Sequence, residues 1–316
     1  MAACRLAREA TLTTAPDVAA VDWGTRRFRL WLMSRNGTVL GECESEEGLE
    51  TGRREGFQAI LDRHLSRLEA PRELPALICG MAGSRQGWKE AGYLRTPAEL
   101  ENLWGHATTI SGLARNVTIL PGVSQASGEG ADVMRGEETR LFGASMEGQG
   151  AHSYCLPGLH SKWVRMAGSR IQSFRTFMTG EMIEVLSRQT ILHHSLEGAA
   201  EVQAGDPAFT TGVRDGWLDA GRITHSIFSV RASHLLEDRT PDENRARLTG
   251  LLIGAEIAGA EPGTNGVALV ASGSIARLYQ SALETCGIEV RLIDADIAVQ
   301  RGLLEVWRSL AKVRRG

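Results

Sequence analysis

The sequence predicts an α/β protein built from two domains of matched topology with a cleft between them. Its length of 316 residues corresponds to two domains at the usual ~100–200 residues each. Strand-like runs occur in two series that pass into amphipathic helices. Each series has a glycine turn between its first and second strands, at Gly24 and at Gly158. Two such domains would place both turns on one cleft, where a phosphate chain could be gripped from two sides.

The first series opens with three expected strands. An apolar run at Val18–Val21 ends at Asp22, an alternating run covers Phe28–Met33, and Asn36-Gly37 predicts a type I′ hairpin turn into the next strand. The other expected elements of this half are strands at Val39–Ser45, Ala76–Cys79 and Val117–Leu120, and helices over 57–68 and Pro97–Ile110.

The second series follows a helix that begins near Arg135–Thr139, where the acidic first turn suits the helix dipole. Its expected elements are strands at Ser153–Leu156, Lys162–Met166, Ile171–Phe177, Val267–Ala271 and Ile288–Ile293, and helices over Met182–His193, 248–259, 275–283 and Ile297–Val313. We therefore expect a loose leader over 1–17, an N-terminal domain over 18–130 and a C-terminal domain over 131–316.

Composition excludes several classes of protein. A net charge of −3 and a pI near 6.3 argue against a general nucleic-acid binder, which needs a basic face. The longest apolar runs are too short to span a membrane, and residues 1–16 do not contain the apolar segment of a secretory signal. Five scattered cysteines without a C-x-x-C motif fit a reducing cytoplasm and no structural zinc. A homo-oligomer is compatible with this composition, which does not define the oligomeric state.

The run Asp22-Trp23-Gly24-Thr25 has the residue types of a phosphate-binding turn. Gly24 lets the backbone approach a ligand closely, and turn N–H groups with the Thr25 hydroxyl can cradle phosphate oxygens. Carboxylates are depleted from strand interiors, so Asp22 is placed either to hold a hydrated Mg²⁺ or to form the turn itself.

Duplicated strands with two glycine turns resemble the ribonuclease-H-like fold of the actin, hexokinase and Hsp70 ATPase superfamily. Asp22-Trp23-Gly24-Thr25 matches its first phosphate loop, and Gly158-Leu159-His160-Ser161 stands where its second phosphate loop belongs. The resemblance implies that Gly273 and Ser274, in the turn that starts at Ala271, bind the nucleoside.

A narrower set of motifs covers nearly the whole chain, from about residue 18 to 308. The motifs are Gly80–Ser84 with Gly87-Trp88, Met134–Leu141, Leu156–Trp163, Phe174–Glu181, Val230–His234 and Leu252–Glu256. Together they look like the 2-dehydro-3-deoxygalactonokinase family, which usually has Thr where this chain has Leu159. The resemblance implies transfer of the ATP γ-phosphoryl group, with Mg²⁺, to the C6 hydroxyl of 2-dehydro-3-deoxy-D-galactonate in galactonate catabolism.

Phosphoryl transfer needs charge neutralisation, positioning and a group that takes the hydroxyl proton. The resemblance implies that Glu137 is this base, because related sugar kinases have an acid at that place, and Glu138 is the rival. Both acids could instead simply favour the helix N-terminus. Asp22 would hold Mg²⁺ through water.

The remaining candidates concern the substrate and the second phosphate loop. A sugar acid has a carboxylate, for which arginine is well shaped, and the candidates are Arg135, Arg175 and Arg231. Ser84 could bond sugar hydroxyls and Trp88 could wall the sugar pocket; their alternatives are a turn residue and a core residue. In the second loop, His160, Ser161 and Lys162 could contact phosphate, although His160 could also pack and Lys162 could point to solvent.

Two other functions remain open at this point. One is a kinase of the same superfamily that acts on another sugar or sugar acid. The other is a non-catalytic, sugar-responsive regulator, which predicts a DNA-binding appendage or loss of the site carboxylates. The chain keeps Asp22, Glu137 and Glu138, and its short leader has no room for a helix-turn-helix.

Overall fold

The computed structural model describes residues 3–6, 15–126, 130–147 and 152–313. The chain forms two compact units. Unit 1 comprises Met1–Glu147, Ala167–Ser173 and Ala295–Gly316, and unit 2 comprises Gly148–Met166 and Phe174–Asp294. This division differs from the predicted boundary at 130/131, because the helices α3 (Glu137–Glu147) and α10 (Ala295–Val313) pack against each other within unit 1.

Unit 1 is organised around a seven-stranded sheet in the order β1-β4-β3-β2-β5-β9-β8. The antiparallel meander β2-β3-β4 continues into β5 and β9, which run parallel to β2. The strands are β1 (Ala3–Leu6), β2 (Val18–Trp23), β3 (Phe28–Met33), β4 (Val39–Ser45), β5 (Ala76–Gly80), β8 (Thr108–Ile110) and β9 (Val117–Ile119). The predicted hairpin is present, but its turn is not type I′, because Gly37 has a positive φ of +96° and Asn36 does not. The Gly37 N–H donates to the Ser34 carbonyl, and the Ser34 N–H donates to the Thr38 carbonyl.

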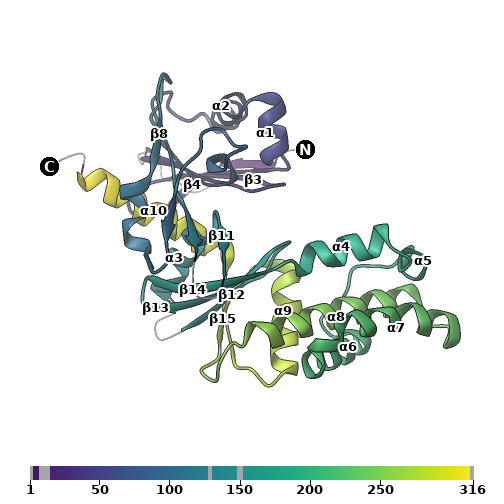
Figure 1. Ribbon diagram of the computed structural model, residues 1–316. Helices are drawn as coiled ribbons and strands as arrows, with labels where there is room; N and C mark the ends of the chain where they lie inside the picture. The colour runs from purple at the N-terminus through teal and green to yellow at the C-terminus, as the bar shows by residue number, and fades with distance from the viewer. Residues whose placement is uncertain (1–2, 7–14, 127–129, 148–151, 314–316) are drawn as a thin grey trace. The chain divides into compact units, whose positions relative to one another are not determined.

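Helices cover both faces of this sheet (Figure 1). The helices α1 (Leu49–Glu55) and α2 (Phe57–Arg67) lie on one face, and α10 lies on the other beside α3. Val21, Phe28 and Ile60 are fully buried between the sheet and α2, and each such side chain contributes about 1.5–3 kcal/mol by leaving water. Gly302 lets α10 approach α3 closely, since a Cβ there would lie 2.0 Å from the Thr139 carbonyl oxygen.

The segment Pro97–Ile110 corrects a prediction, because it is not one helix. It contains β7 (Ala98–Glu99), the 3₁₀ helix η2 (Leu100–His106) and β8. The β-branched residues of β8 favour a strand, and β8 pairs antiparallel with β9. Unit 1 also has the short 3₁₀ helix η1 (Met81–Gly83) and a small sheet of β6 (Tyr93–Arg95), β10 (Gly122–Gln125) and β11 (Asp132–Met134), which the sequence did not indicate.

The predicted loose leader is structured in part. Residues 3–6 form β1, which pairs antiparallel with β4, and a disulfide joins Cys4 to the opposing Cys43. The scatter of cysteines along the sequence did not indicate this bond. Residues 7–14 of the predicted leader lie outside the described residues.

Unit 2 repeats the strand order of unit 1. Its strands belong to a six-stranded sheet in the order β16-β15-β12-β13-β14-β7, of which β7 and residues Arg170–Ser173 of β14 fall in unit 1. Three strands that are consecutive along the chain, β12 to β14, again continue into two parallel strands. They are β12 (Ser153–Leu156), β13 (Ser161–Ala167), β14 (Arg170–Phe177), β15 (Val267–Val270) and β16 (Val290–Ile293). Counted from the first meander strand, both sheets read 3-2-1-4-5. The prediction of two α/β domains of matched, ribonuclease-H-like topology is therefore confirmed.

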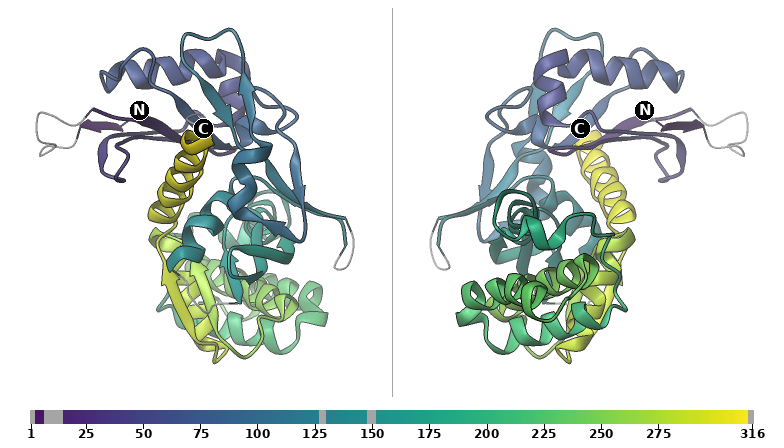
Figure 2. Two further views of the ribbon diagram at one scale, coloured as in Figure 1. Left: turned by 90° about the vertical axis from the view of Figure 1, so that its left-hand side faces the viewer. Right: turned by 90° about the vertical axis from the view of Figure 1, so that its right-hand side faces the viewer.

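Helices form the larger part of unit 2, and α6, α7 and α8 lie side by side (Figures 1 and 2). The helices of unit 2 are α4 (Thr179–Gln189), α5 (His193–Leu196), α6 (Pro207–Leu218), η3 (Ala220–Arg222), α7 (Ile223–Leu236), α8 (Pro241–Ala260) and α9 (Gly273–Thr285). A Cβ on Gly250 would lie 2.2 Å from the Phe209 carbonyl oxygen, so this glycine permits the close contact of α8 with α6. Every helix in the described part of the chain is too short or too polar to cross a lipid bilayer.

Candidate functional site

The first glycine turn follows β2 directly and is open to solvent. The Gly24 N–H donates to the Arg27 carbonyl at 2.7 Å, which closes the turn, and Thr25 is exposed. The carbonyl groups of Gly24 and Thr25 accept from the Leu49 N–H at the start of α1, so the turn backbone is held from one side. An exposed turn whose backbone is held by hydrogen bonds is compatible with a phosphate-binding loop.

Asp22 lies behind this turn in a buried cluster of ions. Its side chain is 3% exposed, and Oδ2 accepts from Arg140 at 2.9 Å and from Arg29, which also pairs with Asp296. Burial alone would raise the pKa of Asp22, but the two guanidinium groups outweigh it and hold the pKa below its usual value. Asp22 is therefore an ionised carboxylate at neutral pH.

Two glycines stand next to the second oxygen of Asp22. A Cβ built on Gly80 would lie 3.4 Å from Oδ1, and one on Gly136 would lie 4.0 Å from it. Both glycines have φ near +90° to +100°, a conformation that L side chains rarely adopt. The ends of β2 and β5 and the start of α3 thus converge around Oδ1, which also accepts from the buried Cys79 thiol at 3.8 Å.

The adjacent acids at the start of α3 occupy different environments. Glu138 is fully buried and accepts from the Gly136 N–H at 2.7 Å and from the Thr139 hydroxyl at 3.0 Å. Burial, with the nearby charge of Glu137, raises the pKa of Glu138 to about 7. Glu137 is half-buried, and its Oε2 accepts from the Arg135 N–H at 3.0 Å. Of the two, Glu137 is the acid that solvent can reach.

Arg135 and Ser84 have polar side-chain atoms without a hydrogen-bond partner among the described residues. The Arg135 guanidinium lies over the Tyr93 ring, 4.3 Å from its centroid, and Nη2 donates to the Ala91 carbonyl at 2.7 Å. Within the described residues, Arg135 Nε and Nη1 and Ser84 Oγ are buried and have no hydrogen-bond partner. A Cβ on Gly83 would lie 2.9 Å from Arg135 Nη1, which places this guanidinium against the loop that contains Ser84.

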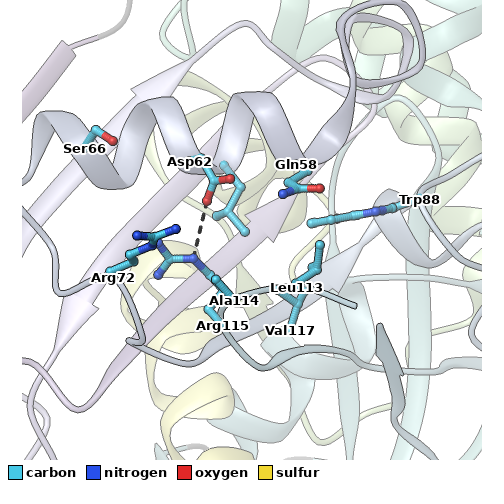
Figure 3. A pocket seen from close by; sticks show the side chains of 10 residues that line it. Gln58, Asp62, Ser66, Arg72, Trp88, Leu113, Ala114, Arg115 and Val117 are labelled. Atoms are coloured by element: carbon cyan, nitrogen blue, oxygen red, sulfur yellow. Dashed lines mark ion pairs between the residues drawn. The ribbon is translucent and has the colours of Figure 1, made fainter. Parts of the chain in front are cut away.

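Trp88, predicted either to wall the sugar pocket or to belong to the core, packs among aromatic side chains of unit 1. Its ring stacks on Phe57 with centroids 6.1 Å apart and contacts the edge of Trp23. It lines a cavity of about 350 Å³ that also contains the Asp62–Arg115 ion pair (Figure 3). Asp22, Glu137 and Arg135 are absent from the described lining of this cavity, so it does not connect Trp88 with the other candidates.

The second glycine turn, between β12 and β13 in unit 2, packs on the start of α4. The Leu159 carbonyl accepts from the Glu181 N–H at 3.1 Å, and the Glu181 carboxylate lies 2.5 Å from His160 Nε2. A Cβ on Gly180 would lie 2.4 Å from the Gly158 carbonyl oxygen, so only glycine allows this approach. His160 itself is exposed.

Ser161 and Lys162, both predicted to contact phosphate, are buried under this turn. The Lys162 ammonium donates to the His160 carbonyl at 3.1 Å. The Ser161 hydroxyl lies 2.9 Å from the Tyr279 hydroxyl, which in turn donates to Glu256 at 2.8 Å. Since Tyr279 gives its only proton to Glu256, the Ser161 hydroxyl donates to Tyr279 and is engaged inside the protein.

Glu256 is a buried acid beneath the second turn to which sequence reasoning gave no role. It is 2% exposed on α8 and also accepts from Trp163 Nε1 at 2.8 Å. Burial raises the pKa of Glu256. The one signal in the sequence was an acid inside the apolar run Leu252–Ile257, because a buried carboxylate needs hydrogen-bond donors.

The last three sets of candidates lie in different parts of unit 2. Gly273 opens α9 with φ +70° and is exposed, as a ligand-binding helix N-terminus requires. Arg175 donates to the Gly259 carbonyl and pairs with Glu261 at the end of α8. Arg231, on α7, donates to the Ser195 hydroxyl. The structure therefore groups Arg135 with the acids of unit 1, whereas Arg175 and Arg231 bond helices of unit 2.

The chain has two units with the actin-like strand order and a glycine turn in each, and acids lie beside the turn of unit 1. This arrangement is compatible with a kinase of the sugar-kinase class. A family model for 2-keto-3-deoxy-galactonokinase matches residues 22–306, and the chain belongs to this family. This result confirms the resemblance on which the predicted function depends.

Individual relatives agree with the family. The chain is 49% identical over 303 residues to a Rhizobium meliloti (strain 1021) protein described as "Probable 2-dehydro-3-deoxygalactonokinase DgoK1", covering 95% of this chain and 99% of the relative. It is 34% identical over 298 residues to the 2-dehydro-3-deoxygalactonokinase of Escherichia coli (strain K12), covering 92% and 98%. A crystal structure from Sinorhizobium meliloti with the same kinase name has a TM-score of 0.89 at 49% identity, covering 93% and 99%.

Proposed function

We propose that the protein transfers the γ-phosphoryl group of ATP to the C6 hydroxyl of 2-dehydro-3-deoxy-D-galactonate. Family membership supports the reaction, and one observation supports the acidic substrate. Arg135 has two buried, unpartnered N–H-bearing nitrogens next to the loop of Ser84, whose buried hydroxyl is also unpartnered among the described residues.

Unpartnered buried polar atoms are expensive, at about 1–3 kcal/mol each. A ligand that accepts hydrogen bonds removes this cost, and an anionic acceptor also neutralises the guanidinium charge. The carboxylate of a sugar acid has both properties. In this proposal Arg135 binds the substrate carboxylate and Ser84 bonds an adjacent oxygen of the substrate.

Glu137 takes the proton of the C6 hydroxyl, because it is the accessible acid of the pair. Glu138 accepts a hydrogen bond from the Gly136 N–H and thereby fixes the backbone that leads into α3. Its full burial separates Glu138 from any substrate, although its pKa near 7 would suit a base. The Arg135 backbone N–H donates to the Glu137 carboxylate and orients it.

Asp22 fits a role in holding hydrated Mg²⁺. It is ionised, its Oδ2 is held by two arginines, and its Oδ1 faces the backbone of two glycines with only the weak donor of the Cys79 thiol against it among the described residues. When bound, Mg²⁺ would neutralise charge on the phosphates. Gly24 would shape the first turn, because its N–H is given to Arg27, and the exposed Thr25 would bind phosphate oxygens there. The turn at Gly158–His160 would bind phosphate oxygens from unit 2, and Gly273 with Ser274 would contact the nucleoside.

The proposal is tested by ADP release with a panel of 2-keto-3-deoxy sugar acids that includes the galacto and gluco epimers, with the phosphorylated carbon assigned by NMR. We expect turnover of the galacto epimer with phosphate on C6. Turnover of only another sugar or sugar acid would support the alternative kinase, and no turnover with functional nucleotide binding would support a regulator. A cytoplasmic location belongs to this proposal. Cys79, Cys155 and Cys286 are free thiols, as a reducing compartment favours, whereas the Cys4–Cys43 disulfide is of a kind more common in oxidising compartments.

Arg135→Gln separates the arginine candidates. It should raise KM for the sugar acid by about tenfold or more, because a charge-assisted hydrogen bond contributes about 1.5–3 kcal/mol, and should leave KM for ATP nearly unchanged. Arg175→Gln is the matched control, since Arg175 bonds the end of α8. Equal KM values for wild type and Arg135→Gln, or a larger effect in the control, would contradict the assignment.

A further inference from the structure

A second group of reactive side chains lies in unit 1 at the edge of its sheet. Cys4 on β1 and Cys43 on β4 stand directly opposite each other and are joined by a disulfide. His64 on α2 is fully buried against them, with Nδ1 3.9 Å from Cys4 Sγ. Ligand atoms of these three residues lie within 4.8 Å of one another. The phosphoryl-transfer reaction uses none of them.

Glu47 determines how the His64 ring is oriented. The Glu47 carboxylate lies 2.6 Å from His64 Nε2 and also pairs with Arg63. Burial would raise the pKa of Glu47, but hydrogen bonds from Ser45, His64 and Arg63 outweigh this effect and lower it to about 2. Burial also lowers the pKa of His64. A neutral imidazole therefore donates Nε2–H to an ionised Glu47, and its Nδ1 lone pair faces Cys4.

A disulfide has no proton that the Nδ1 lone pair could accept, whereas a thiol has one. When the bond is reduced, the Cys4 S–H can donate to Nδ1, and the imidazole can take the proton as the thiolate forms. Cys4 is half-buried, whereas Cys43 is 2% exposed. An external reagent therefore meets Cys4 first, and Cys43 is placed to attack afterwards.

The remaining cysteines are poor competitors for such a reagent. Cys79, Cys155 and Cys286 are buried free thiols, and burial raises the pKa of each. A thiol whose pKa is raised by an apolar environment has little of the reactive thiolate. The chain thus has one accessible thiol with a base beside it and a second thiol opposite it.

We propose that Cys4 and Cys43 form a reversible thiol–disulfide exchange site for a low-molecular-weight disulfide such as oxidised glutathione. The Cys4 thiolate attacks one glutathione sulfur, His64 takes the Cys4 proton, and one glutathione leaves as a thiolate that is protonated. Cys43 then attacks the Cys4 sulfur of the mixed disulfide, and the second glutathione leaves. The protein loses two electrons and two protons, and glutathione disulfide becomes two thiols.

The experiment equilibrates the full-length protein in buffers of defined reduced-to-oxidised glutathione ratio, blocks thiols with a maleimide and counts them by mass spectrometry. We expect Cys4 and Cys43 to change together as a two-electron couple within the glutathione range, while the three buried cysteines stay unchanged. Cys43→Ser should trap glutathione on Cys4. A bond that glutathione neither forms nor reduces would overturn the proposal, as would an unmodified Cys4 in Cys43→Ser.

His64→Gln tests the base. Reoxidation of this variant at pH 7 should be about tenfold slower or more, because the thiolate fraction sets the rate of attack, while kinase activity shows that the fold is kept. Glu47→Gln, at a less buried position, should slow reoxidation to a smaller extent and serves if His64→Gln does not fold. Unchanged rates in both variants would overturn the role of His64. A stoichiometric Zn²⁺ complex of the reduced protein that blocks reoxidation would assign the cluster to metal binding instead.

Discussion

The two units support their glycine turns with different chemistry. In unit 1, the acid behind the turn is Asp22, which is bound by two arginines in a cluster of charges. In unit 2, the acid beneath the turn is Glu256, which accepts from a tyrosine hydroxyl and an indole N–H. The strand order is the same in both units, so topology does not explain the difference.

The charge state of each acid explains the difference between the two units better than topology does. The arginines keep Asp22 ionised despite its burial, so that a full negative charge stands beside Gly80 and Gly136. Neutral donors surround Glu256, and its pKa is raised. We infer that the charged support, Asp22 with its two arginines, serves chemistry on phosphate and metal. The neutral support, Glu256 with its uncharged donors, holds the second turn in place.

Glu137→Gln is the largest expected effect and tests the chemical side of this comparison. It should lower kcat by about 10²–10⁴-fold, the usual contribution of a positioned base, while ATP binding measured by calorimetry persists. Glu138→Gln is the matched control and should retain more of the wild-type kcat. A Glu137→Gln variant with near-normal turnover would show that the acid is not the base.

Asp22→Asn removes the central charge of the unit 1 cluster without changing its size. Breaking a buried ion pair by removing one partner costs about 3–5 kcal/mol, because the other charges stay buried and unpaired. We expect a stability loss of this order, measured by urea unfolding, together with weaker dependence of activity on Mg²⁺. A stability equal to that of the wild type would mean that Arg29 and Arg140 do not depend on Asp22.

The pKa of Glu138 predicts how stability changes with pH. Its folded pKa of about 7 lies above the ordinary value of 4.5, so the folded protein keeps a proton that the unfolded chain releases. Stability from this group is fully present below pH 4.5 and falls as the pH rises to about 7, by about 3 kcal/mol in total at ~1.36 kcal/mol per unit. Glu138→Gln should remove this slope from unfolding curves, and an unchanged slope would exclude Glu138 as its source.

Glu256→Gln makes the same acid-to-amide exchange in unit 2 and should have the smallest effect. Tyr279 can reverse and accept from the new amide, so about one hydrogen bond is lost, which costs about 0.5–1.5 kcal/mol. KM for ATP should rise modestly, because Tyr279 and Ser161 lie under the second turn, and kcat should change less than KM. A stability loss as large as that of Asp22→Asn would remove the distinction between the two supports.

Periodic and local features were predictable from the sequence. The alternation in Phe28–Met33 and the apolar run at Val18–Val21 were recovered as β3 and β2, because side-chain burial follows a period of two along a strand. The turn at Gly37 follows from local backbone preference. The proximity of Arg135 to the Ser84 loop was not derivable from spacing, although both residues had been selected by their chemistry.

Other features depend on partners that are distant along the chain. The segment Pro97–Ile110 contains two short strands because β9 and β14 pair with them. Ser161 faces inward because its hydroxyl forms a hydrogen bond with Tyr279, which lies 118 residues further along the chain. Cys4 meets Cys43 only through the pairing of β1 with β4.

The sequence by itself determined the class of fold, the two glycine turns and the family, because these depend on periodicity and on motifs that are contiguous in the chain. Only the tertiary structure decided which acid is buried, which hydroxyl forms an internal hydrogen bond, and which arginine has N–H groups without a partner among the described residues. Those properties depend on desolvation and on hydrogen-bond partners, and folding alone brings such partners together.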